Sequence, residues 1–100
     1  MTDIELRIRV LLTMQSVLLG AIGHNLRAVA CRWDSNSIRV RSVFDGVISS
    51  IDRELMDDIE TEVISHFPTA AVTIECIRVD APNRISLEAT EVYVYRRLED

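Results

Sequence analysis

The chain has 100 residues and a formal net charge of −5, and all 11 of its basic residues are arginine. Its length predicts one domain, residues 1–100, with a single core of modest size. The acidic total disfavours binding to nucleic acid or to an anionic membrane surface, and the lack of lysine excludes Schiff-base and P-loop chemistry.

The first predicted element is a helix that begins at a capping box and ends near Ile22. Thr2 and Glu5 have the spacing at which each side chain satisfies a free backbone N–H of the first turn. Apolar residues fill most of the helical wheel, and an apolar arc this wide buries more than one side of a helix. The helix therefore either lies across a sheet beside a second helix or forms a homodimer interface.

The same segment differs from a signal peptide and from a membrane span. Asp3 and Glu5 stand where a signal peptide carries basic residues, and polar side chains interrupt the apolar run that follows. The run is also too short to cross a bilayer. We therefore expect a cytoplasmic protein that does not bind membranes.

Two pairs of strands and a second helix account for the rest of the chain. Segments 27–34 and 37–45 are rich in Val, Ile and aromatic residues and are separated by a tight turn. Segments 70–80 and 91–99 form a second pair joined by a loop, and the helix between the two pairs ends at Pro68. We predict an α+β fold in the chain order α-β-β-α-β-β, with a four-stranded antiparallel sheet and two helices packed on one face.

The second helix concentrates the negative charge of the chain. The run from Asp52 to Glu62 contains six carboxylates and one arginine, so its charge equals the net charge of the whole chain. Helical spacing places four of these carboxylates on or beside the solvent-facing side, namely Glu54, Asp57, Asp58 and Glu60. Together with Trp33 and Asp34 at the tip of the first hairpin, they are the predicted partner-binding residues. The alternatives are a solvated helix face and a core position for Trp33.

No residue pattern has the spacing of a catalytic, cofactor or metal site. Cys31 and Cys76 form no CxxC motif and are expected to be reduced thiols. His24 and His66 lack zinc-ligand spacing. A nucleophile elbow and a glycine-rich phosphate loop are both missing, and acid–base catalysis requires carboxylates in a desolvated cleft instead of on a wet helix face. We therefore expect no enzyme activity, no cofactor and no metal.

Three motifs follow one another within residues 27–68: a strand with W-[DE], a strand ending in F-D-G-x-I-S, and an acidic helix that ends in F-P. The matching residues are Trp33-Asp34, Phe44-Asp45-Gly46, Ile48-Ser49, Asp52, Glu54 and the run 59–68. In this order they resemble small bacterial immunity proteins of contact-dependent growth inhibition and related polymorphic toxin systems. The resemblance weakens after Pro68, where only the sequence IRVDAP is similar.

The resemblance implies a cytoplasmic immunity protein that binds and blocks the C-terminal toxin domain of a large secreted effector. Such toxins are often nucleases, which are basic because they hold a polyanion. The interaction would be one-to-one and non-catalytic. The matched residues are expected to be structural, so the acidic helix face is predicted from its charge and not from the resemblance. The alternative is a small homo-oligomeric adaptor or regulator whose first helix forms the dimer interface.

Overall fold

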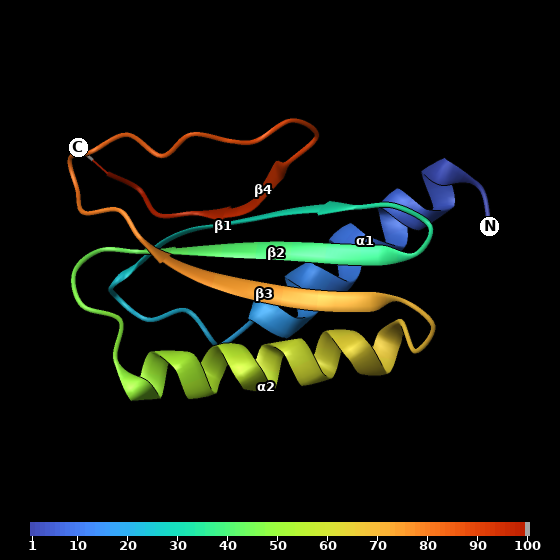
Figure 1. Ribbon diagram of the computed structural model, residues 1–100, viewed down its shortest axis with the longest axis horizontal. Helices are drawn as coiled ribbons and strands as arrows, with labels where there is room; N and C mark the ends of the chain where they lie inside the picture. The colour runs from blue at the N-terminus through green and yellow to red at the C-terminus, as the bar shows by residue number, and fades with distance from the viewer. Residues whose placement is uncertain (100) are drawn as a thin grey trace.

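The computed structural model describes residues 1–99, and Asp100 lies outside the described residues. The elements within this range are α1 (Asp3–Leu18), β1 (Leu26–Trp33), β2 (Ser37–Phe44), α2 (Ser50–His66), β3 (Ala71–Arg78) and β4 (Val92–Arg96). Figure 1 shows the strands side by side, with α1 behind the sheet and α2 running along β3.

The sheet is mixed, and its spatial strand order, β3-β2-β1-β4, differs from the order along the chain. β1 pairs antiparallel with β2 and with β4, whereas β2 and β3 are parallel. The prediction of an antiparallel sheet is therefore wrong for β3. The reason is α2, because a helix that follows β2 returns the chain to the end where β2 began, and the next strand then runs parallel to β2.

The buried core joins both helices to one face of the sheet. Its members include Val10 and Met14 from α1, Met56, Ile59 and Val63 from α2, and Val29, Cys31, Ile38, Val40 and Val72 from the sheet. The sheet residues share a face because side chains alternate along each strand and the strand register aligns them. Burial of this apolar surface is the main favourable contribution to folding.

α1 ends at Leu18, before the predicted end near Ile22. Leu19 leaves the helical conformation, and Gly20 follows with φ of +80°, a backbone conformation that glycine adopts without strain.

Part of the apolar surface of α1 is exposed to solvent. The exposed residues are Ile4, Ile8 and Leu12, which are four residues apart. They form an apolar stripe on one side of α1.

The β3–β4 connection contacts part of the other sheet face. In Figure 1 it leaves β3 at one edge of the sheet and returns to β4 at the opposite edge. Arg41 of β2 holds it in place, since its guanidinium donates to the Ser86 carbonyl (2.8 Å) and forms a 2.6 Å ion pair with Glu91. Ala30 and Val43 are buried on this face. The face therefore contributes to folding, and Arg41 is part of a covered ion pair.

Candidate partner-binding surface

The first turn of α2 is fixed by a reciprocal capping box. The Ser49 hydroxyl accepts from the Asp52 N–H (3.0 Å), and the Asp52 carboxylate accepts from the Ser49 N–H (2.9 Å). Asn25 also donates to Asp52, at 2.8 Å. The backbone hydrogen bond from Ser49, followed by the bond from Asn25, lowers the pKa of Asp52. Asp52 therefore has a structural role. The other carboxylates of α2 are the candidates for partner binding.

The outer side of α2 gathers four exposed carboxylates. Because Met56, Ile59 and Val63 are buried against the sheet, helical spacing turns the opposite side to solvent. The exposed carboxylates are Glu54, Asp57, Asp58 and Glu62. Residues three and four apart are neighbours on a helix surface, so the four form one continuous patch, here named the acidic face. Glu62 belongs to it but was not among the predicted residues, although its spacing from Asp58 indicates the same side.

The acidic face has no cationic partner within residues 1–99. Every ion pair in this part of the chain joins an arginine to a carboxylate of the loops or the C-terminal segment. None involves a carboxylate of α2. The negative charge of this helix is therefore directed to solvent, where it is available to attract a basic molecule.

Glu60 occupies a different environment from the other predicted residues of α2. It is half-buried, and its carboxylate accepts from the Ile74 backbone N–H at 3.0 Å. Ile74 lies in β3, an edge strand of the sheet. Unpaired N–H groups on an edge strand can recruit another strand and cause aggregation, so Glu60 protects this edge. This contact could not be predicted from the sequence because it depends on α2 packing beside β3.

Trp33 and Asp34 lie at the end of β1, and both make contacts within the chain. Trp33 is half-buried against the core, with the Arg7 guanidinium 5.7 Å from its ring centroid. One oxygen of Asp34 accepts from the backbone N–H groups of Asn36 (2.7 Å) and Ser37 (2.8 Å). The Asn36 bond is the largest cause of the lowered pKa of Asp34. Asp34 therefore fixes the hairpin turn while remaining exposed.

The six predicted residues do not form one cluster. Figure 1 places the β1–β2 turn at the end of the molecule where α2 finishes. Glu54 lies near the start of α2, and the twelve residues from there to His66 correspond to about 18 Å along the helix axis. Glu54 is therefore well separated from the Trp33–Asp34 tip, whereas Glu62 lies about one turn from the end of α2.

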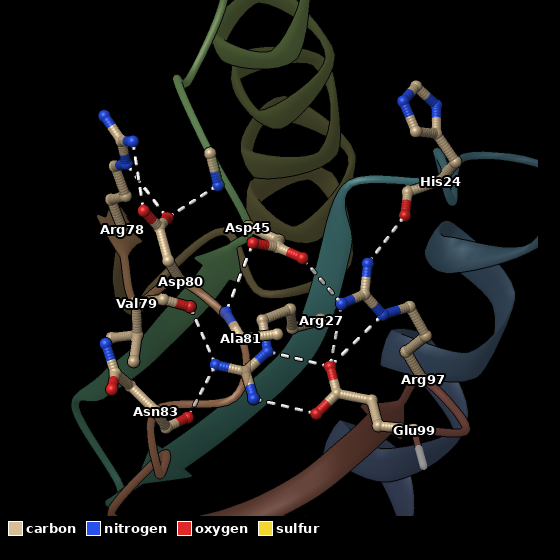
Figure 2. A network of polar contacts seen from close by, with 11 residues as sticks. His24, Arg27, Asp45, Arg78, Val79, Asp80, Ala81, Asn83, Arg97 and Glu99 are labelled. Atoms are coloured by element: carbon tan, nitrogen blue, oxygen red, sulfur yellow. Dashed lines mark hydrogen bonds and ion pairs between the residues drawn. The ribbon is translucent and has the colours of Figure 1, made fainter.

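Two of the segments that are similar to the family, F-D-G and IRVDAP, meet in a structural network drawn in Figure 2. The Asp45 carboxylate accepts from the Ala81 N–H at 3.2 Å, and the Asp80 carboxylate accepts from the Gly46 N–H at 2.7 Å. Gly46 has φ of +82°, which favours glycine. The F-D-G and IRVDAP segments thus fasten each other across the end of the parallel strand pair. Their role in these contacts is structural.

Arg27 is the centre of the second half of this network (Figure 2). It is only 4% exposed, and it forms a two-pronged ion pair with Glu99 at 2.7 Å. It also donates to the carbonyls of Val79 (2.7 Å) and Asn83 (2.9 Å). The hydrogen bonds from Arg27, followed by those from Arg97, lower the pKa of Glu99 from 4.5 to about 2. These charges hold the C-terminal segment against the loop after β3.

The described residues contain no group of three or more His, Cys, Asp or Glu side chains that could hold a metal ion. Cys31 and Cys76 are both free thiols, and burial raises the pKa of Cys31 to about 12. Neither helix in residues 1–99 has the length and apolar composition needed to cross a membrane.

Comparison with known proteins identifies a family. A family model described as MafI2 immunity protein matches residues 7–99. None of the curated proteins compared with the chain matches it significantly. The family match confirms the resemblance to small bacterial immunity proteins, and it extends that resemblance through the region after Pro68.

Proposed function

Because the chain belongs to the MafI2 immunity protein family, we propose that it binds and neutralises the C-terminal toxin domain of a large secreted effector. The interaction is one-to-one and non-catalytic, and it takes place in the cytoplasm of the cell that makes the toxin. The chain acts as a single domain within a contact-dependent growth inhibition or related polymorphic toxin system.

The acidic face is the observation that supports a basic toxin domain as the partner. Its carboxylates are exposed and have no cationic partner within residues 1–99. A nuclease concentrates positive charge where it holds nucleic acid, and an acidic inhibitor can occupy that site in place of phosphates. Opposite charges also accelerate encounter and fix the orientation of the bound partner. A nuclease is therefore our proposed class of toxin.

Glu54, Asp57 and Asp58 are the proposed centre of the contact. Glu60, whose carboxylate already accepts from the Ile74 N–H, contributes charge at the edge of the patch. Trp33 and Asp34 lie at the β1–β2 turn and reach only a partner large enough to extend beyond α2. The proposal includes no binding of nucleic acid and no cofactor.

A growth assay tests this proposal. The toxin domain encoded by the gene directly upstream is expressed from an inducible promoter, and it is expected to stop growth. Co-expression of the wild-type chain should restore growth, and Asp57→Asn/Asp58→Asn should restore it less well. Asp3→Asn/Glu75→Gln is the matched control, because it removes two exposed carboxylates elsewhere. Toxicity that the wild-type chain leaves unchanged would contradict the proposal.

The apolar stripe on α1 favours a second function, that of a homo-oligomeric adaptor or regulator. Ile4 and Leu12 are 72% and 65% exposed, which is unusual for large apolar side chains spaced along one helix side. A second copy that covers this stripe would make the chain a dimer. Sedimentation at several concentrations distinguishes the two functions, since this alternative requires a concentration-dependent dimer that Ile8→Glu abolishes, in a protein without a toxin partner.

A further inference from the structure

A large open cavity lies on the side of the sheet away from the helices. It has a volume of about 1030 Å³ and is bounded by the loop after β3 and by strand β4 with the C-terminal segment. Its lining combines arginine, an aromatic ring and aliphatic side chains, including Arg84, Leu87, Tyr93, Arg96 and Leu98. This composition differs strongly from that of the acidic face.

The cavity wall carries positive charge that residues 1–99 do not neutralise. Arg27 and Arg97 also line it, but both form ion pairs with Glu99. Arg84 and Arg96 are exposed and form no ion pair with the described carboxylates. The Arg96 guanidinium lies 4.8 Å from the Tyr93 ring centroid, so the ring orients the cation at the wall. The site therefore offers two available guanidinium groups.

Apolar side chains stand beside these guanidinium groups. Leu98 is 96% exposed and Leu87 is 42% exposed. An exposed leucine next to arginine and tyrosine matches the composition of protein–protein contact centres, in which Tyr and Arg are enriched. A free phosphate or nucleotide would use the arginines but would leave the leucines uncovered. The lining thus favours a polypeptide occupant.

We propose that this cavity is a second docking site for the toxin domain and that it receives a toxin segment in which an acidic side chain is adjacent to an apolar one. The acidic side chain pairs with Arg84 and Arg96, and the apolar side chain covers Leu98. The inference rests on the proposed immunity function. With negative charge on α2 and positive charge on the opposite side, the two surfaces specify a partner of complementary polarity and a single bound orientation.

Dissociation rates of the purified upstream toxin domain, measured by surface plasmon resonance, test the proposal. Arg96→Glu should accelerate dissociation about tenfold, and Arg84→Glu/Arg96→Glu about a hundredfold, because like charges then oppose each other in the contact. Arg39→Glu is the matched control. Arg39 is likewise an exposed strand arginine without an ion pair in residues 1–99, but it does not line this cavity, and its change should stay within about twofold.

Leu98→Ser provides a second variant that leaves the charge unchanged. Since Leu98 is almost fully exposed, its replacement should leave the melting temperature unchanged and still accelerate dissociation about fivefold. A reciprocal Asp→Arg or Glu→Arg change in the toxin segment should restore slow dissociation to Arg96→Glu. That restoration would identify the segment directly.

The outcomes separate the two proposals. Absence of binding between the wild-type chain and the toxin would overturn the immunity function. Tight wild-type binding, with Arg84→Glu/Arg96→Glu and Leu98→Ser dissociating as slowly as Arg39→Glu, would overturn the cavity proposal and leave the immunity function intact. Slow dissociation of the same variants together with binding of inorganic phosphate in the cavity would likewise reject a toxin segment as its occupant.

Discussion

Within residues 1–99, carboxylates near the C-terminal segment are paired with arginines, whereas those on the outer side of α2 are not. Asp45 and Glu99 both contact Arg97, and Glu91 is paired with Arg41. The acidic face has no such contact within residues 1–99. The same residue types therefore fasten the chain in one region and leave their charge available in the other.

Like charges lie close together on the acidic face. Glu54 and Asp58 are four residues apart on α2, and so are Asp58 and Glu62. Like charges at this spacing destabilise a helix by about 0.2–0.5 kcal/mol per pair. We therefore expect the paired region to stabilise the protein and the acidic face to cost a small amount of stability.

The largest effect on stability is expected from breaking the paired region at Arg27. Arg27→Ala removes four hydrogen bonds and leaves the Val79 and Asn83 carbonyls without their donor. Glu99 is 29% exposed and regains water when Arg27 is removed, so we expect a loss of about 2 kcal/mol, mainly from the unsatisfied polar groups, which urea denaturation measures. Arg39→Ala, the exposed control, should change stability by less than about 0.5 kcal/mol. An equal, small effect of both changes would contradict a structural role for the network.

A smaller effect is expected from titrating Glu99, because Arg27 keeps its carbonyl contacts when Glu99 is protonated. The folded pKa of about 2 is below the ordinary value of 4.5, so the contribution of Glu99 is present above pH 4.5 and is lost as the pH falls towards 2. Urea denaturation of wild type and Glu99→Gln should give a stability difference at pH 6 that shrinks at pH 3. A difference independent of pH would show that the ion pair does not stabilise the fold.

Within α2, Glu60 and Glu54 compare a carboxylate that accepts a hydrogen bond from the chain with one that is exposed to solvent. Glu60→Ala removes the acceptor of the Ile74 N–H and should lower the free energy of unfolding by about 1 kcal/mol. Glu54→Ala removes no internal contact and should stay within about 0.5 kcal/mol of wild type. Equal losses in thermal denaturation would mean that the two carboxylates have the same role.

The smallest predicted effect has the opposite sign. Asp58→Asn removes one charge from two like-charge pairs, so it should raise the free energy of unfolding by a few tenths of a kcal/mol. Repeating the measurement in high salt should reduce the gain, because salt screens exposed charges. Destabilisation by Asp58→Asn would assign the acidic face to folding and remove the contrast with the paired region.

Local patterns in the sequence predicted the elements but not their assembly. Capping residues and Pro68 indicate where the helices begin or end, and these signals lie within a few residues of the ends they mark. The direction of β3 depends on how α2 returns the chain, which no strand pattern records. The hydrogen bond between Glu60 and Ile74 joins residues 14 positions apart, and the ion pair between Arg41 and Glu91 joins residues 50 positions apart. Both contacts therefore follow only from the assembled fold.

The acidic face was predictable because its charge density is a property of one helix, whereas the cavity was not. Arg84 and Arg96 lie in separate segments that the β3–β4 connection brings together. The sequence shows both arginines, but their lack of an ion pair within residues 1–99 becomes visible only once the partners of the other arginines are known. The position of Trp33 near the hairpin turn was predicted, but its exposure was not, because that depends on the packing of α1.

Calorimetry of the chain with the upstream toxin domain, at two salt concentrations, tests whether the acidic face binds the toxin. We expect tight one-to-one binding that weakens in high salt, and a further loss of about tenfold or more with Asp57→Asn/Asp58→Asn. The control Asp3→Asn/Glu75→Gln should bind nearly as tightly as wild type. Binding that is insensitive to both salt and Asp57→Asn/Asp58→Asn would contradict a role for the acidic face in toxin binding. No binding at all would contradict the immunity function.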